Sequence, residues 1–306
     1  MKAVRIGAAM AAMAMLCPET GHAEELWNAY PLRGFWEGLP AGATPPKGVY
    51  TAVSAYWAND RYYGEQGKAV PGTDLTAFVV TPVIEWVPGV KILGGTYSVG
   101  IAQPFVYNTS AGLSGSTGRG NWGTFNTVLL PAQLGWKLHN VHVKLGVGVY
   151  LPNASSTVSD LYAGKLHNGG LPSGSNFAAV EPDLGITWMH KGWNVSAALH
   201  AAIPISASTA PGYRYWSGSE FAADYTITKT LGKWTLGVGG HQINQYEDDR
   251  FNGEVVPDHR SQLYGVGPIA GVQAGPLNIT AMWNRTVSAR NAVAGDMVQV
   301  RFTTRL

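Results

Sequence analysis

Apolar and polar residues alternate along much of the chain with a period of two. In the stretch 141–151 every odd position is valine or leucine, and His142 and Lys144 stand between them. The stretches 193–205 and 298–306 show the same alternation. Successive side chains of a strand point to opposite faces, and in a membrane barrel one face meets lipid and the other the lumen. The pattern therefore predicts membrane-spanning β-strands.

The predicted strands have the number and connections of an outer-membrane barrel, which has an even strand count, short periplasmic turns and long outer loops. About twelve segments carry the pattern, near 48–58, 74–87, 90–106, 122–138, 141–152, 176–190, 192–206, 219–231, 233–246, 260–273, 277–288 and 296–306. Tight turns such as Pro88-Gly89 and Lys191-Gly192 alternate with polar loops near 59–73, 107–121, 153–175, 207–218, 247–259 and 289–295. The sequence thus predicts an all-β fold, a transmembrane antiparallel β-barrel of about twelve strands over residues 47–306.

Aromatic side chains gather at the predicted strand ends. The tryptophans close to tight turns are Trp86, Trp136, Trp188, Trp193 and Trp234. Tryptophan is favoured at the interface between membrane and water, so these residues predict an aromatic girdle on the periplasmic side. The last strand carries Phe302 but ends in Leu306. It otherwise has the amphipathic pattern that the barrel-insertion machinery reads, and we expect that machinery as a partner.

Composition agrees with a surface that is largely in lipid. Charged residues make up 13% of the chain, against roughly 25% in ordinary soluble domains. No mature stretch is apolar for the roughly 18 residues of a transmembrane helix, which leaves the barrel as the way to span a bilayer. The chain has no basic run, so nucleic acid is not an expected partner. Its single cysteine, Cys17, lies before the predicted mature chain, which excludes thiolate metal sites and disulfides there.

Residues 1–23 have the features of a secretory signal peptide. Lys2 and Arg5 precede a short apolar stretch, and Ala23 ends a small-residue pattern that suits cleavage. We expect cleavage after Ala23 and delivery to the bacterial outer membrane. The alternative is lipidation of Cys17, although Leu16 occupies the position where a small residue is expected.

Residues 24–46 differ from the rest, with four aromatic side chains set among several prolines. The segment follows neither the helical nor the strand period. So many aromatic residues argue against disorder. We favour a plug that folds into the lumen over a periplasmic linker. The plug candidates are Trp27, Tyr30, Phe35 and Trp36.

Alternation aims a set of polar side chains at the lumen. These candidates are His142, Lys144, Glu181, Asp183, His200, Asp224, His241, Gln299 and Arg301. A ring of one charge sign selects ions. Both signs occur here, beside many glycines and alanines, which favours a pore for small neutral or weakly polar solutes. The alternative is that these residues pair across the lumen and stabilise the wall.

Four prolines fall in the middle of predicted strands, at Pro82, Pro131, Pro182 and Pro268. Proline donates no ladder hydrogen bond and is normally confined to edges or bulges. A closed barrel has no edge. These positions therefore predict bulges or breaks in the wall. They either bend strands to shape the barrel or open a side window that lets apolar solutes pass into the bilayer.

The sequence offers little catalytic chemistry. The histidines of the predicted strands have no serine in a nucleophile-elbow setting. His139 and His142 have the spacing of a weak metal pair, but we predict His139 in a turn. Glu247, Asp248 and Asp249 fall in a predicted outer loop, where we expect solvated carboxylates. We therefore predict no enzyme activity, no metal site and no cofactor.

Two motifs resemble a known family. The stretch EGLPAGATPPKGVY at 37–50 and the stretch YGVGP at 264–268 are similar to outer-membrane transporters associated with the meta-pathway of phenol degradation. The resemblance covers nearly the whole mature chain. It implies an outer-membrane channel and a link to the breakdown of aromatic compounds. It supplies no functional residues that can be carried over.

The leading hypothesis is an outer-membrane channel for passive uptake of small hydrophobic or aromatic molecules. Its expected partners are outer-membrane lipid and the small-molecule solutes. One alternative is a structural or adhesion barrel whose loops bind a partner, and another is an outer-membrane enzyme. Solute flux distinguishes the channel from both.

Overall fold

The computed structural model describes residues 32–110, 120–165 and 171–306. The predicted signal peptide and the plug candidates Trp27 and Tyr30 lie outside the described residues. The described elements are β1 (Gly48–Tyr63), β2 (Leu75–Val87), β3 (Lys91–Ile92), β4 (Gly95–Ala102), β5 (Phe105–Ser110), β6 (Asn121–Thr124), β7 (Val128–Leu138), β8 (Val141–Tyr150), α2 (Val158–Tyr162), β9 (Ala179–His190), β10 (Trp193–Pro204), β11 (Ser208–Ala210), β12 (Tyr213–Trp216), β13 (Glu220–Leu231), β14 (Trp234–Gln245), β15 (Arg250–Phe251), β16 (Glu254–Val255), β17 (Gln262–Ala274), β18 (Leu277–Arg290) and β19 (Ala292–Arg305).

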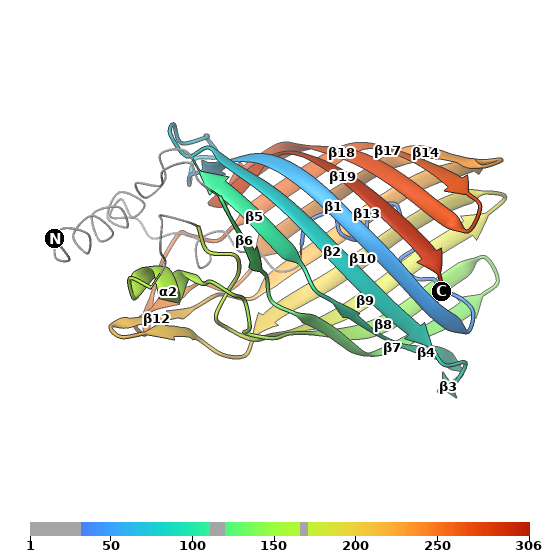
Figure 1. Ribbon diagram of the computed structural model, residues 1–306, viewed down its shortest axis with the longest axis horizontal. Coiled ribbons are helices and arrows are strands. Elements are labelled where there is room, and N and C mark those ends of the chain that lie inside the picture. The colour runs from blue at the N-terminus through green and yellow to red at the C-terminus, as the bar shows by residue number, and fades with distance from the viewer. Residues whose placement is uncertain (1–31, 111–119, 166–170) are drawn as a thin grey trace.

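These strands form a closed antiparallel barrel of 12 strands, as the alternation predicts (Figure 1). The first and last strands close the wall, with β1 and β19 paired from Tyr50–Arg305 to Tyr63–Ala292. Two strands of the wall are interrupted. One is made of β4 followed by β5, and the other of β6 followed by β7. Closure pairs the wall strands with neighbours on both sides along most of their length, which satisfies the backbone in lipid.

Tight turns join the strands at one end of the barrel. Between β9 and β10 the turn consists of Lys191 and Gly192 alone, with φ angles of 46° and 80°. Two successive positive φ values define the type I′ turn, whose twist matches that of the flanking strands. The predicted loop at 289–295 is wrong. Only Asn291, with φ 47°, separates β18 from β19, so both strands extend further outward than the sequence pattern indicated.

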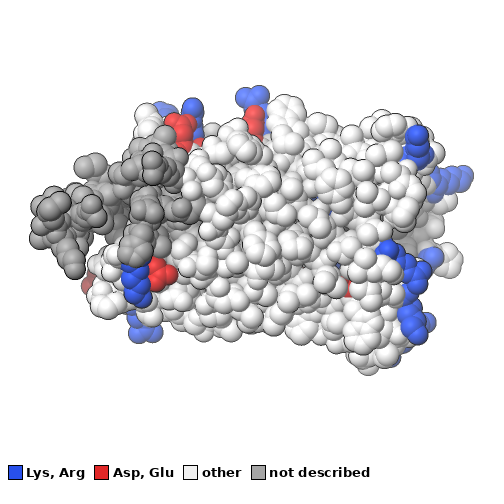
Figure 2. Space-filling view, viewed as in Figure 1, with Lys and Arg blue, Asp and Glu red and all other residues white. Residues whose placement is uncertain are grey.

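The two faces of the wall differ in chemistry as the alternation requires. On β14 the outward side chain of Leu236 is 53% exposed, whereas on β19 the inward side chain of Arg301 is 2% exposed. On the face shown in Figure 2, most charged side chains lie toward the two ends and the broad middle is uncharged. This is the apolar band that a membrane barrel presents to hydrocarbon.

The long loops pack together at the opposite end from the C-terminus. A second, four-stranded sheet contains β11, β12, β15 and β16. Tyr213 and Tyr215 of β12 pack against Val158 of α2 in a buried cluster. In the described ranges, no helix is long and apolar enough to cross a membrane.

Candidate functional site: the filled lumen and its outer cavity

The described part of the N-terminal segment, residues 32–46, runs inside the barrel. Its first anchor is Arg33, whose guanidinium donates to both carboxylate oxygens of Asp60 at 2.7 and 2.6 Å. The second is Asp224 of β13, which accepts from the backbone N–H of Gly34 at 3.1 Å and of Trp36 at 2.7 Å. These charged contacts join the segment to opposite parts of the wall.

Glu37 is the most deeply buried anchor, with 0% of its side chain exposed. Its two carboxylate oxygens lie 2.8 Å from His241 Nδ1 and 2.9 Å from Asn284 Nδ2. Its backbone carbonyl accepts from Arg301 at 2.7 Å, and the same guanidinium donates to the carbonyl of Phe35. A buried charge is tolerated only when it is paired and hydrogen-bonded, so these contacts hold the segment against β14, β18 and β19.

Trp36 is held between two basic side chains. Lys144 Nζ lies 4.7 Å from the centre of the indole ring, and the ring of His200 stacks on it at 6.1 Å and 21°. A cation over the face of a tryptophan ring is stabilising, more so when it is desolvated. Trp36 therefore anchors the segment to β8 and β10.

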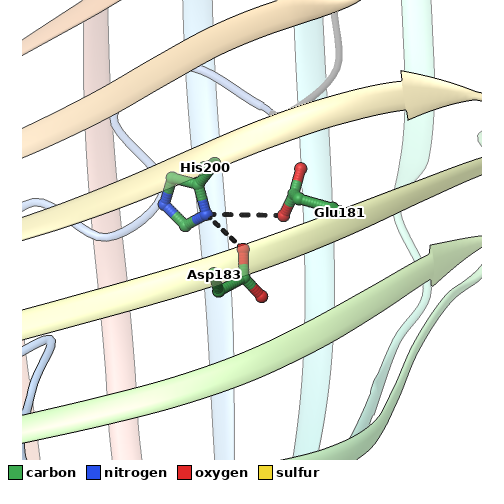
Figure 3. A group of neighbouring side chains, drawn as sticks. All are labelled: Glu181, Asp183 and His200. Carbon is green, nitrogen blue, oxygen red and sulfur yellow. Dashed lines mark hydrogen bonds and ion pairs between the residues drawn. The ribbon is translucent and has the colours of Figure 1, made fainter.

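His200 is in turn bound by two carboxylates, as Figure 3 shows. Its Nδ1 lies 2.6 Å from Asp183 and 3.5 Å from Glu181, and the hydroxyl of Tyr150 donates to Glu181 at 3.0 Å. The ligand atoms of the three acid and imidazole groups lie within 4.8 Å of one another. This group has the donor types that bind a divalent metal. Its contacts in the structure orient the imidazole under Trp36.

The lower part of the segment touches backbone directly. A Cβ on Gly42 would lie 2.4 Å from the carbonyl oxygen of His142, and one on Gly185 would lie 2.3 Å from that of Ala41. The N–H of Gly42 donates to Thr187 Oγ1 at 2.8 Å. Only glycine permits two backbones to approach this closely. Gly42 of the segment and Gly185 of the wall therefore let the two backbones pack in direct contact.

The structure brings the sequence-predicted lumen residues together around this segment. Buried in the barrel interior are Lys144, Glu181, His200, Asp224, His241, Gln299 and Arg301, whereas Asp183 and His142 are partly exposed. Gln299 contacts Ser54 across the β1–β19 ladder. Pairing and anchoring therefore occupy the buried members of this set in the structure. Their part in solute passage stays a prediction.

Several anchors were not among the sequence candidates. Asp60 was missed because the predicted first strand ended at residue 58, whereas β1 continues to Tyr63. No pattern in the sequence singled out Glu37. Asp249 was expected to be solvated and is instead buried, accepting from the hydroxyl of Tyr215 at 2.5 Å and the N–H of Gly218 at 2.7 Å. The loop sheet, which the sequence did not reveal, covers this carboxylate.

The four wall prolines occupy different settings. Pro131 lies at a register shift between Leu129 and Ala132 in the β7–β8 ladder. Pro82 lies where β2 changes its partner from β5 to β4. Pro182 and Pro268 pair regularly on one side, and on the other side the ladder skips them without a register shift at the proline. A fifth wall proline, Pro104, lies between β4 and β5. It was not among the prolines predicted to interrupt the wall.

A cavity of about 100 Å³ lies in the outer half of the lumen, with Leu32, Arg33 and Asp60 in its lining. Most of the other lining side chains are apolar, and they include Leu75, Ala77, Val79, Val106, Phe125 and Ile243. A small number of polar groups in an apolar pocket is the usual composition of a small-molecule site.

Comparisons with known proteins agree with this architecture. The barrel of the COG4313 outer membrane channel from Pseudomonas putida F1 superposes with a TM-score of 0.70 at 15% identity, covering 87% of this chain and 98% of that one. The translocator domain of the autotransporter NalP from Neisseria meningitidis gives 0.45 at 12% identity, covering 87% and 91%. The Pseudomonas putida toluene transporter TodX gives 0.41 at 10% identity, covering 86% and 90%. Of these three superpositions, the first is the one that supports the architecture.

No curated protein matches the chain. Residues 58–302, which are most of the chain, match the model of a family described as "Putative MetA-pathway of phenol degradation". The protein therefore belongs to this family.

Proposed function

We propose that the protein is an outer-membrane channel for passive uptake of small hydrophobic or aromatic molecules. The observation that carries the proposal is a cavity lined mostly by apolar side chains, inside a closed barrel whose outer surface is apolar. An apolar cavity of roughly 150 Å³ binds benzene in another protein, so a cavity of about 100 Å³ is of the right order for a single aromatic ring.

Two further observations support a channel for this class of solute. The family description connects its members with phenol degradation, and the Pseudomonas putida protein that shares the fold is described as an outer membrane channel. The described segment 32–46 acts in this proposal as a plug, because Arg33 borders the cavity and the contacts of Glu37 with His241 and Arg301 fill the lumen beyond it. Water and ions then cross poorly while small apolar molecules bind above it.

Filling the cavity tests the proposed solute class. Ala77 lines the cavity and is buried, so Ala77→Phe places a ring where the solute would bind. We expect toluene binding to protein in lipid nanodiscs, measured beyond that of empty nanodiscs, to weaken about tenfold or more because the space is lost. Leu236→Phe, which adds a ring on the lipid face, is the matched control. Equal toluene binding by Ala77→Phe and the parent would contradict the cavity as the solute site.

A further inference from the structure

The two ends of the barrel differ in charge. The described residues at the end of the tight turns carry the basic side chains Lys47, Lys91, Lys137, Lys191, Lys229, Lys233 and Arg305. They include a single acidic side chain, Glu85, which points into the lumen and accepts from Ser98 Oγ at 2.9 Å. At the end of the long loops both signs occur and pair, as Arg61 does with Asp74 at 2.6 Å. Basic side chains accordingly dominate the turn end in Figure 2.

Three of these lysines lie on two neighbouring turns. Lys191 belongs to the turn between β9 and β10, Lys233 to the turn between β13 and β14, and Lys229 to the last part of β13. The turns are adjacent because β10 pairs with β13, and the N–H of Thr230 donates to the carbonyl of Gly192 at 2.8 Å. Lys229 Nζ donates to the carbonyl of Lys191 at 2.6 Å. The three lysines therefore share one short arc of the rim, which we call the lysine site.

Two tryptophans lie beside the lysine site. Lys229 Nζ lies 5.2 Å from the ring centre of Trp193, and Lys233 Nζ lies 5.8 Å from that of Trp234. Both indole rings are exposed on the outer surface of the wall. Tryptophan is favoured at the level of the lipid headgroups, and lysine places its ammonium there while its stem lies along apolar surface. The lysine site is thus at the depth of lipid phosphates.

Apolar side chains continue from the lysine site toward the middle of the barrel. In the strand register Lys229 lies between Trp193 of β10 and Leu236 of β14. The next outward row consists of Val195, Ile227 and Val238. All three are exposed on the lipid face. A molecule with its phosphate on the lysines would therefore lay its hydrocarbon chains along this apolar row.

We propose that the lysine site binds an anionic phospholipid of the inner leaflet of the outer membrane. Short turns of such barrels face the periplasm, which places Lys191, Lys229 and Lys233 in that leaflet. Clustered lysines attract lipids with a net negative charge. The outer surface of the described turn end offers no acidic side chain for the cationic group of a zwitterionic headgroup, so the site prefers phosphatidylglycerol to phosphatidylcholine. This inference does not depend on the proposed uptake function.

Native mass spectrometry of the detergent-solubilised protein tests the site. Binding of phosphatidylglycerol and of phosphatidylcholine with the same acyl chains is compared for the parent and for Lys191→Gln/Lys229→Gln/Lys233→Gln. The matched control is Lys47→Gln/Lys91→Gln/Lys137→Gln, which removes the same charge from the same end of the barrel on other strands. Heat-modifiable migration on a gel verifies that each variant is folded.

We expect the parent to bind phosphatidylglycerol about tenfold more tightly than phosphatidylcholine. The preference should disappear in the variant of the lysine site and persist in the control. Added salt should weaken it in the parent, because exposed charges are screened. A large excess of inorganic phosphate should not displace the lipid, since phosphate gains nothing from the apolar row.

Three results would overturn the proposal. One is equal binding of the two lipids by the parent. Another is an equal loss of the preference in both triple variants, which would mean that the charge of the whole rim acts without a site. The third is complete displacement by inorganic phosphate, which would make the ligand a free anion. Toluene uptake should be the same in the variant of the lysine site and the parent, so a failure of the uptake function is detected separately.

Discussion

Deleting residues 24–46 should open the lumen of the barrel to ions. We expect the single-channel conductance to rise about tenfold or more. The described part of this segment fills the lumen through Arg33, Trp36 and Glu37. A barrel of this strand number encloses more space than one of about eight strands, which its own side chains fill. Without the segment, water and ions should occupy that space. Conductance in planar lipid bilayers is the measurement.

The wall should remain folded in this variant because the strand pairs that close it, such as β1 with β19, include no residue of the segment. Heat-modifiable migration on a gel verifies this. Deleting only residues 24–31 separates the two parts of the segment, since all described contacts of residues 32–46 stay in place in this variant. A conductance equal to that of the parent would assign the closure to residues 32–46. A folded protein lacking 24–46 whose conductance is unchanged would mean that the segment is a linker and that another part of the chain closes the lumen.

Asp224→Asn should loosen the plug without removing it. The Asp224 carboxylate accepts from the N–H groups of both Gly34 and Trp36. An asparagine has a single carbonyl oxygen, and its amide donor would face one of those N–H groups. A hydrogen bond to a charged group is worth about 1.5–3 kcal/mol, and about 1.4 kcal/mol is a factor of ten in an equilibrium. The fraction of time that the channel spends open should therefore rise about tenfold to a hundredfold.

Asp248→Asn is the matched control for this substitution. Asp248 pairs with Arg260 at 2.7 Å in an outer loop, and this contact lowers the pKa of the Asp248 carboxyl. It does not touch the N-terminal segment, so its loss should leave the open fraction as in the parent. If Asp224→Asn left the open fraction unchanged, as we expect of the control, the hydrogen bonds at Gly34 and Trp36 would have no part in closing the lumen.

The alternation of residues predicted the barrel because the two sides of its wall meet different surroundings. A strand in lipid must present apolar side chains at every second position, so the outward face of Leu236 and the inward face of Arg301 follow from the sequence. Register follows as well, since a shift by one residue would reverse every side chain. Turn sequences such as Lys191-Gly192 marked the strand ends independently of the alternation.

The contacts that anchor the N-terminal segment could not be predicted from such patterns. Glu37 meets Asn284 and Arg301 across more than two hundred residues, and residues 24–46 have no periodicity that could fix which wall position they contact. The interruption between β6 and β7, where Asn126 bonds Ser175, depends on loop residues far along the chain. Prolines in mid-strand indicated that the wall is irregular, but they did not indicate where its ladder ends.

The most direct test of the uptake function is the rate at which intact cells take up isotope-labelled toluene from dilute solution. A strain lacking the protein is compared with the same strain carrying the parent or Ala77→Phe. The lipopolysaccharide of intact cells retards apolar solutes, so a protein-dependent rate becomes visible. We predict faster toluene uptake with the parent than without it, and little gain with Ala77→Phe. Equal rates in the three strains would contradict uptake of apolar molecules through this barrel.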